Sequence, residues 1–151
     1  HIAERRHRAD HRALPARTER VTDMTREAQI TLVQRYFSGV DGEDLDQVLA
    51  TLTETCRFSV ETHGVMLTGH AEIGGMMRQL WGRHKAVLHD SFHYVCDPEN
   101  GTIATQFRVV NTLHDGTQVY KSNCNFFSIE NGKFNSVAVY MAGENTLERK
   151  T

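Results

Sequence analysis

The fold is decided by residues 86–141, AVLHDSFHYVCDPENGTIATQFRVVNTLHDGTQVYKSNCNFFSIENGKFNSVAVYM. Four runs of alternating apolar and polar residues in this stretch are separated by turn sequences that end in Asn-Gly, Asp-Gly and Asn-Gly. A period of two is typical of strands, and these dipeptides are strong signals for tight hairpin turns. The stretch therefore predicts an antiparallel meander of four long strands, at residues 86–97, 102–113, 117–129 and 133–141.

Before these strands, the pattern changes to helical spacing. Apolar residues recur with a period near 3.6 in three segments, residues 25–40, 44–52 and 70–83. Thr25 is a weak N-cap for the first helix, and Asp44 or Asp46 suits the N-cap of the second. Two short alternating runs flank His63-Gly64, which predicts a hairpin before the third helix. Three helices followed by a long meander indicate an α+β fold.

Length and composition narrow the class of protein. The chain has 151 residues, 39% of them hydrophobic, and a formal net charge of -2, which suits one globular domain and gives no support to nucleic-acid binding. Because no apolar run approaches the ~18 residues of a membrane span, we expect no membrane segment. The three cysteines are widely spaced and odd in number, so we expect reduced thiols and a cytoplasmic location.

Residues 1–23 differ from the rest of the chain. They carry six Arg and three His but few large apolar side chains. We expect them to be a leader or an arm, possibly helical, that either is solvated or docks on a partner subunit. The folded domain is then expected to span residues 24–151.

The order of elements resembles the nuclear transport factor 2-like superfamily, which includes ketosteroid isomerases, SnoaL-type polyketide cyclases and scytalone dehydratase. Three motifs carry the resemblance: VQRYFSGVDGEDLDQVLATL (33–52), GHAEIGGMM (69–77) and ENGKFNSVAVYMAGEN (130–145). It covers roughly residues 28–145. It implies a cone-shaped α+β barrel, in which three N-terminal helices pack on a curved, mostly antiparallel sheet and enclose a pocket.

The resemblance also implies positions for an active site. The oxyanion-hole tyrosine of the isomerases falls on Tyr36, and their oxyanion-hole carboxylic acid falls on Asn125. Their general-base aspartate falls on Val60, which cannot take a proton, so ordinary ketosteroid isomerase chemistry is not expected. Dehydratase-like members carry a pocket histidine near His89, while their second pocket histidine falls near Asn111.

His89 is therefore the candidate general base, because an unperturbed imidazole titrates near pH ~6.5. Strand alternation groups His89 with Ser91 and His93, and it leaves open which face of this strand points inward. On the third long strand, alternation groups Lys121, Asn123 and Phe127 with Asn125. The expected substrate-binding wall comprises Val60, Trp81, Phe107, Asn111, Phe127, Val139 and Met141.

Together these residues predict a cofactor-independent enzyme that acts on a hydrophobic, oxygenated substrate by proton transfer, in an enolisation, cyclisation or dehydration. Tyr36 and Asn125 would polarise an oxygen, and His89 would move the proton. The alternative is a non-catalytic ligand-binding or dimerisation module on the same fold. The histidine spacing matches no metal-site pattern and no nucleotide-binding motif is present, so neither a metal nor a cofactor is expected.

A homodimer through the sheet is also expected. The face opposite the pocket would carry large apolar groups on the last two strands, namely Tyr120, Cys124, Phe126, Phe134, Ala138 and Tyr140. An exposed patch of that size usually marks an interface, and two-fold dimers are the commonest assembly.

Overall fold

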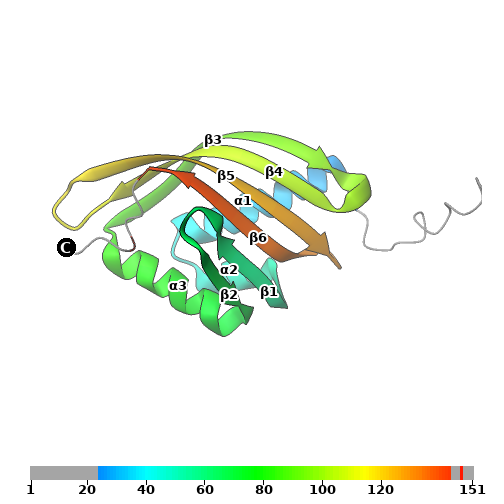
Figure 1. Ribbon diagram of the computed structural model, residues 1–151, viewed down its shortest axis with the longest axis horizontal. Coiled ribbons are helices and arrows are strands. Elements are labelled where there is room, and N and C mark those ends of the chain that lie inside the picture. The colour runs from blue at the N-terminus through cyan, green and yellow to red at the C-terminus, as the bar shows by residue number, and fades with distance from the viewer. Residues whose placement is uncertain (1–23, 144–146, 148–151) are drawn as a thin grey trace, which may run out of the picture.

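The computed structural model describes residues 24–143 and residue 147 (Figure 1). The expectations for residues 1–23 therefore lie outside the described residues. The elements are α1 (Arg26–Asp41), α2 (Leu45–Ala50), β1 (Leu52–Val60), η3 (Glu61–His63), β2 (Val65–Thr68), α3 (Gly69–Arg83), β3 (Ala86–Asp97), η4 (Pro98–Asn100), β4 (Thr102–Thr112), β5 (Gln118–Glu130) and β6 (Lys133–Ala142). None of the helices described is long and apolar enough to cross a membrane.

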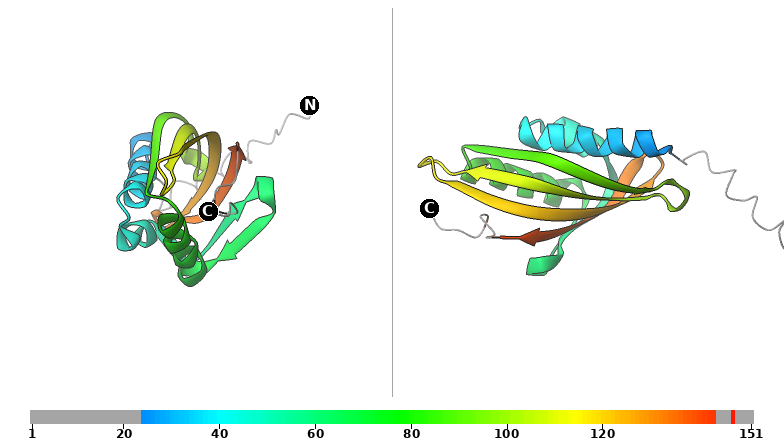
Figure 2. Two further views of the ribbon diagram at one scale, coloured as in Figure 1. Left: turned by 90° about the vertical axis from the view of Figure 1, so that its left-hand side faces the viewer. Right: turned by 90° about the horizontal axis from the view of Figure 1, so that it is seen from above.

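The strands form one open, six-stranded sheet in the order β2-β1-β6-β5-β4-β3. β3 to β6 make the predicted antiparallel meander, and β1 and β2 make the predicted hairpin. β1 pairs with β6 in parallel, so the sheet is mixed. It curves over the three helices, which lie against its concave side (Figure 2). The α+β cone expected from the sequence is confirmed, although the sheet does not close into a full barrel.

Thr25 caps α1 as predicted, and Asp44 is the one of the two candidates, Asp44 and Asp46, that caps α2. The Thr25 Oγ1 atom accepts the Ala28 N–H at 3.1 Å, and the Asp44 Oδ1 atom accepts the Gln47 N–H at 3.1 Å. Each bond satisfies one of the backbone donors that a helix leaves unpaired at its start. At Gly39 an added Cβ would lie 2.9 Å from Val48, so this glycine lets α2 pack closely on α1.

A β-bulge in β3 overturns the simple alternation predicted for that strand. The register with β4 shifts between Asp90 and His93, and Ser91 has a φ of 60°. The extra residue reverses the side chains that follow it. Phe92 is therefore partly buried and packs against Phe37, while His93 is exposed instead of sharing the face of His89.

A second irregularity corrects the predicted outer patch. Ile129 pairs with Phe134 but Ser128 pairs with Ser136, which leaves Asn135 as the extra residue of β6. Phe134 consequently points inward, where its ring lies 4.5 Å from that of Phe127. It belongs to the core and not to the exposed apolar face.

Candidate functional site

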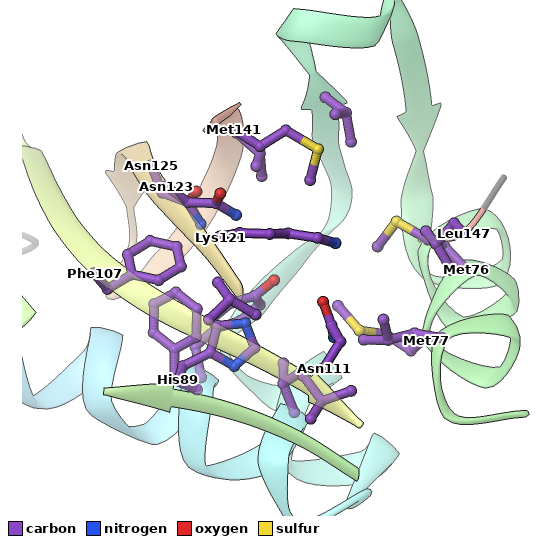
Figure 3. A pocket seen from close by; sticks show the side chains of 18 of the residues that line it. Met76, Met77, His89, Phe107, Asn111, Lys121, Asn123, Asn125, Met141 and Leu147 are labelled. Carbon is purple, nitrogen blue, oxygen red and sulfur yellow. The ribbon is translucent and has the colours of Figure 1, made fainter. Parts of the chain in front are cut away.

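A cavity of about 100 Å³, here called the inner cavity, lies between the concave face of the sheet and helices α1 and α3 (Figure 3). A larger outer cavity, of about 430 Å³, adjoins it and shares four of its lining residues, Val60, Met76, Met141 and Leu147. The two cavities therefore lie next to each other. Met76, Met77 and Leu80 of α3 and Phe37 of α1 make the inner wall mostly apolar.

Eight of the ten residues predicted for the site line the inner cavity, namely Tyr36, Val60, His89, Phe107, Asn111, Asn125, Val139 and Met141. Trp81 lies outside the wall, and its indole Nε1–H donates to the Val40 carbonyl at 2.8 Å. The last carbonyls of a helix lack intrahelical partners, which explains that contact at the end of α1. Phe127 lies one layer deeper, where its ring packs 5.8 Å from that of Tyr36.

The register of the sheet arranges the inward side chains in rows across the strands. One row contains Val60, Val139, Asn125 and Thr105. The next contains Met141, Asn123 and Phe107, and a third contains Lys121, Val109 and His89. Because rows on one face are two residues apart, about 6.7 Å separates their Cα atoms along a strand. Asn123 and Phe107 of the middle row therefore separate the row of His89 and Lys121 from the row of Asn125 on the cavity floor.

His89 is held by Asp41, the last residue of α1. The Asp41 carboxylate accepts the His89 Nδ1 proton at 2.5 Å and the His89 backbone N–H at 2.8 Å. The Asp41 side chain is 21% exposed, and the His89 side chain is 11% exposed. Because an ionised carboxylate can only accept hydrogen bonds, Nδ1 carries a proton in this pair, and in the neutral ring the lone pair lies on Nε2. The ring is fixed between Phe37 and Phe107, at centroid distances of 4.7 and 5.5 Å.

Tyr36 can act only as a neutral hydroxyl near neutral pH. Burial, reinforced by nearby Cys56 and Asp41, raises the pKa of its phenol well above the usual value. Its O–H therefore remains a hydrogen-bond donor at the wall of the inner cavity.

The amides of β5 are buried with unused hydrogen-bonding capacity. Asn125 is 2% exposed and Asn123 is 8% exposed. Among the described residues neither Oδ1 atom has a hydrogen-bond partner. Since buried polar groups in proteins are nearly always paired with protein or water, these two oxygens are placed to accept hydrogen bonds from a molecule in the cavity.

Residues 33–137 match the profile of the SnoaL-like domain. The chain belongs to the SnoaL-like domain family. No curated protein sequence gives a significant match.

Solved structures similar to this SnoaL-like chain share its fold. A protein from Xanthomonas campestris pv. campestris, provisionally assigned as a polyketide cyclase, is 18% identical with a TM-score of 0.71, covering 76% of this chain and 90% of its own. An LEH-like epoxide hydrolase from M. tuberculosis is 18% identical, with a TM-score of 0.64. The match covers 77% of this chain and 84% of the hydrolase chain. TerC, co-crystallised with polyporic acid, is 12% identical, with a TM-score of 0.66. The match covers 74% of this chain and 89% of the TerC chain.

Three polar residues of this SnoaL-like site were not predicted from the sequence. Lys121 and Asn123 line the cavity, and Asp41 holds His89. Asp41 directly follows the segment predicted as the first helix and was given no role, although a carboxylate at that point can reach the sheet. Lys121 and Asn123 were placed on the same strand face as Asn125 but were given no role. That shared alternation was the signal that could have identified them. Within the described ranges, no three His, Cys, Asp or Glu side chains gather as a possible metal site.

Proposed function

We propose that this SnoaL-like protein is a cofactor-independent enzyme that moves a proton on a hydrophobic, oxygenated small molecule. The observation that carries the proposal is the Asp41–His89 pair at an otherwise mostly apolar cavity. A general base needs a free lone pair, a fixed orientation and a partner that stabilises its protonated form. The Asp41 carboxylate fixes the orientation of the His89 ring and would stabilise its protonated form.

In the proposed first step, His89 Nε2 takes a proton from a carbon next to a carbonyl group. The C–H electron pair moves into the carbonyl, which becomes an enolate, and the imidazolium that forms is stabilised by Asp41. The Tyr36 O–H and the Asn125 amide N–H groups would donate to the enolate oxygen. Return of the proton to another carbon completes an isomerisation, whereas loss of hydroxide gives a dehydration and attack on a second carbonyl gives a cyclisation.

The comparisons support a small molecule as the ligand. The similar structures include a provisional polyketide cyclase, an epoxide hydrolase and a complex with polyporic acid. The base would differ from that of the isomerases, because Val60 of β1 occupies the aspartate position that the resemblance assigns. In this chain the proton carrier would stand on β3, on the opposite side of the cavity floor from β1.

The alternative is a non-catalytic binding module, which Val60 favours. Deuterium exchange at C1 of 2-tetralone, followed by NMR in D₂O, separates the two. We expect the protein to accelerate exchange and His89→Gln to lower the enzymatic rate by about 10²- to 10⁴-fold, the usual contribution of a general base. His93→Gln is the matched control, because this exposed histidine of the same strand faces outward. A ketone that binds to the protein but exchanges no faster than in buffer would establish the binding module instead.

A further inference from the structure

The inner cavity is too small to hold a large substrate by itself. Its volume is about 100 Å³. An apolar cavity of about 150 Å³ holds a single benzene ring, and pockets for small molecules usually measure about 300–1,000 Å³. The adjoining outer cavity, at about 430 Å³, reaches that range. A ligand larger than one ring must therefore extend from the inner cavity into the outer one.

The boundary between the two cavities is built from both layers of the fold. Val60 of β1 and Met141 of β6 belong to the sheet, Met76 belongs to α3, and Leu147 completes the shared wall. From this boundary the outer cavity continues between α3 and the β1–β2 hairpin. These two elements supply its remaining described lining residues, which are Val65, Leu67, Glu72 and Gln79.

His89 lies at the opposite end of the inner cavity from this boundary. It belongs to β3, which forms the other edge of the sheet from the β1–β2 hairpin, and it lines the inner cavity only. Figure 3 shows His89 and Phe107 on one side of the cavity and Met76 and Leu147 on the other. Four strand spacings, or about 19 Å along the sheet, separate β3 from β1. A ligand whose reacting carbon meets His89 therefore directs its far end toward the outer cavity.

The lining changes from polar to apolar in the same direction. The inner cavity contains His89 and the amides of Asn123 and Asn125, whose buried Oδ1 atoms have no partner among the described residues. The outer cavity is lined mainly by Val, Leu and Met side chains, and its two polar residues, Glu72 and Gln79, are exposed. The two cavities together therefore suit a molecule that is oxygenated at one end and apolar at the other.

The wall of the outer cavity also leaves apolar surface uncovered. Four of its side chains pack against the core and yet remain partly exposed, namely Val65, Leu67, Met76 and Met141. Removing apolar surface from water is favourable roughly in proportion to its area. An apolar group seated between α3 and the hairpin would cover this surface.

We infer that the substrate is a ketone with an apolar tail, which lies in the outer cavity between α3 and the β1–β2 hairpin while the ketone end faces His89. This inference rests on the proposed function, because it takes His89 as the base. It makes Leu67 and Gln79, which line the outer cavity from the hairpin and from α3, residues that determine specificity through the tail alone.

Three ketones test the tail by calorimetric titration: 2-tetralone, 6-butyl-2-tetralone and 8-butyl-2-tetralone. C6 lies at the opposite end of the ring system from the carbonyl carbon C2, whereas C8 lies beside the reacting carbon C1. We expect the 6-butyl ketone to bind the wild-type protein at least about tenfold more tightly than 2-tetralone, since four half-buried carbon groups contribute about twofold each. The 8-butyl isomer has the same apolar area at the wrong end, so it should bind no more tightly than 2-tetralone. This comparison needs no variant.

Variants then assign the preference to the outer cavity. Leu67→Trp fills the outer cavity from β2 and should abolish the preference for 6-butyl-2-tetralone over 2-tetralone. Gln79→Trp should do the same from α3, and the exposed position of Gln79 makes this variant the safer one for folding. Met66→Trp is the matched control, because Met66 is the neighbouring residue of β2, is 59% exposed and lines neither cavity. It should change no affinity by more than about twofold.

The outcomes separate this inference from the proposed function. A wild-type protein that binds the 6-butyl ketone no more tightly than 2-tetralone, or no more tightly than the 8-butyl isomer, overturns the inference. A preference that survives both Leu67→Trp and Gln79→Trp overturns it as well. If exchange of 2-tetralone still depends on His89 in these cases, the proposed function stands. Conversely, the expected preferences in a protein that exchanges no ketone support the tail site and contradict catalysis.

Discussion

His89 and Lys121 flank Val109 in one row across β3, β4 and β5. Two strand spacings, or about 10 Å, therefore separate their Cα atoms on the cavity floor. A protonated His89 would meet a second positive charge in the same low-dielectric space, and the Asp41 carboxylate is placed to offset it. We therefore expect the Asp41–His89 pair to contribute to stability as well as to the proposed proton transfer.

Asp41→Asn should lower the free energy of unfolding by about 1.5–3 kcal/mol, because two hydrogen bonds to a charged acceptor are weakened. Urea denaturation of the two proteins gives this difference. The same variant should slow 2-tetralone exchange while leaving 2-tetralone affinity nearly unchanged, since Asp41 positions the ring and does not line the inner cavity. Asp90→Asn is the control, because it breaks an exposed ion pair with Arg108 and should cost less. Equal losses in both variants would contradict a special role for Asp41.

Val60→Asp should introduce a second base at the aspartate position of the isomerases. Val60 lies in the row of Asn125, so the new carboxylate would share the cavity with that amide. Burial raises the pKa of such a carboxyl group, and only its ionised form can accept a proton from carbon. We therefore expect extra 2-tetralone exchange that grows with pH. Val60→Asn has the same shape without the base, and a Val60→Asp protein that behaves like it would exclude this geometry.

We propose a homodimer through the outer face of the sheet. Tyr120 and Phe126 are 59% and 54% exposed, and Phe126 packs edge-on against Tyr140 at 5.9 Å. Light scattering at micromolar concentration should give the dimer mass, and Phe126→Lys should shift it toward the monomer by placing a charge in the apolar patch. Met66→Lys is a matched control, because Met66 is equally exposed but lies on the edge strand β2. A monomer mass for the wild-type protein would remove the proposal.

The stability of the protein should fall as the pH drops below about 6.5, the ordinary histidine pKa, and His84 should contribute to that fall. Burial lowers the pKa of His84, and Lys121, His114 and Arg83 lower it further, against a raising effect of the Leu80 carbonyl. The unfolded chain then binds a proton that the folded chain resists, so stability decreases on acidification through this range. His84→Asn, which can still donate to the Leu80 carbonyl, should reduce the slope of unfolding free energy against pH. An unchanged slope would show that other groups govern it.

We expect a chain that lacks residues 1–23 to remain folded. The core cluster of the described residues runs from Leu32 to Val139, so its apolar contacts form without the deleted segment. A loss of at most about 1–2 kcal/mol is expected, within the range of ordinary perturbations. Thermal unfolding should remain cooperative. Loss of a cooperative transition would place the segment in the core.

Sequence patterns were most reliable where local chemistry determines structure. The Asn-Gly and Asp-Gly turns of the meander and the caps at Thr25 and Asp44 depend on neighbouring residues only, and all form as predicted. The extra residues at Ser91 and Asn135 could not be predicted, because a bulge depends on the register with the partner strand. Each reversed a predicted face, which misplaced His93 and Phe134.

The candidate site shows the same division between local and long-range information. Alternation placed Asn125 and Lys121 on one face, but it carries no information on which helix residue lies opposite a strand. Asp41 meets His89 across 48 positions of sequence, and only the packing of α1 on β3 brings them together. The resemblance to the isomerases directed attention to Tyr36 and Val60, and it assigned no role to Asp41.

The parallel pairing of β1 with β6 affects how the protein folds during synthesis. Val60 pairs with Val139, so the β1–β2 hairpin has no other strand to join until the last strand has been synthesised. A two-stranded hairpin is marginally stable alone. Pairing β1 with β6 also closes the long stretch of chain between them, which is slow. The floor of the cavity would therefore be completed only after β6 has left the ribosome, and until then the edges of β1 and β5 stay open to chaperones or to aggregation.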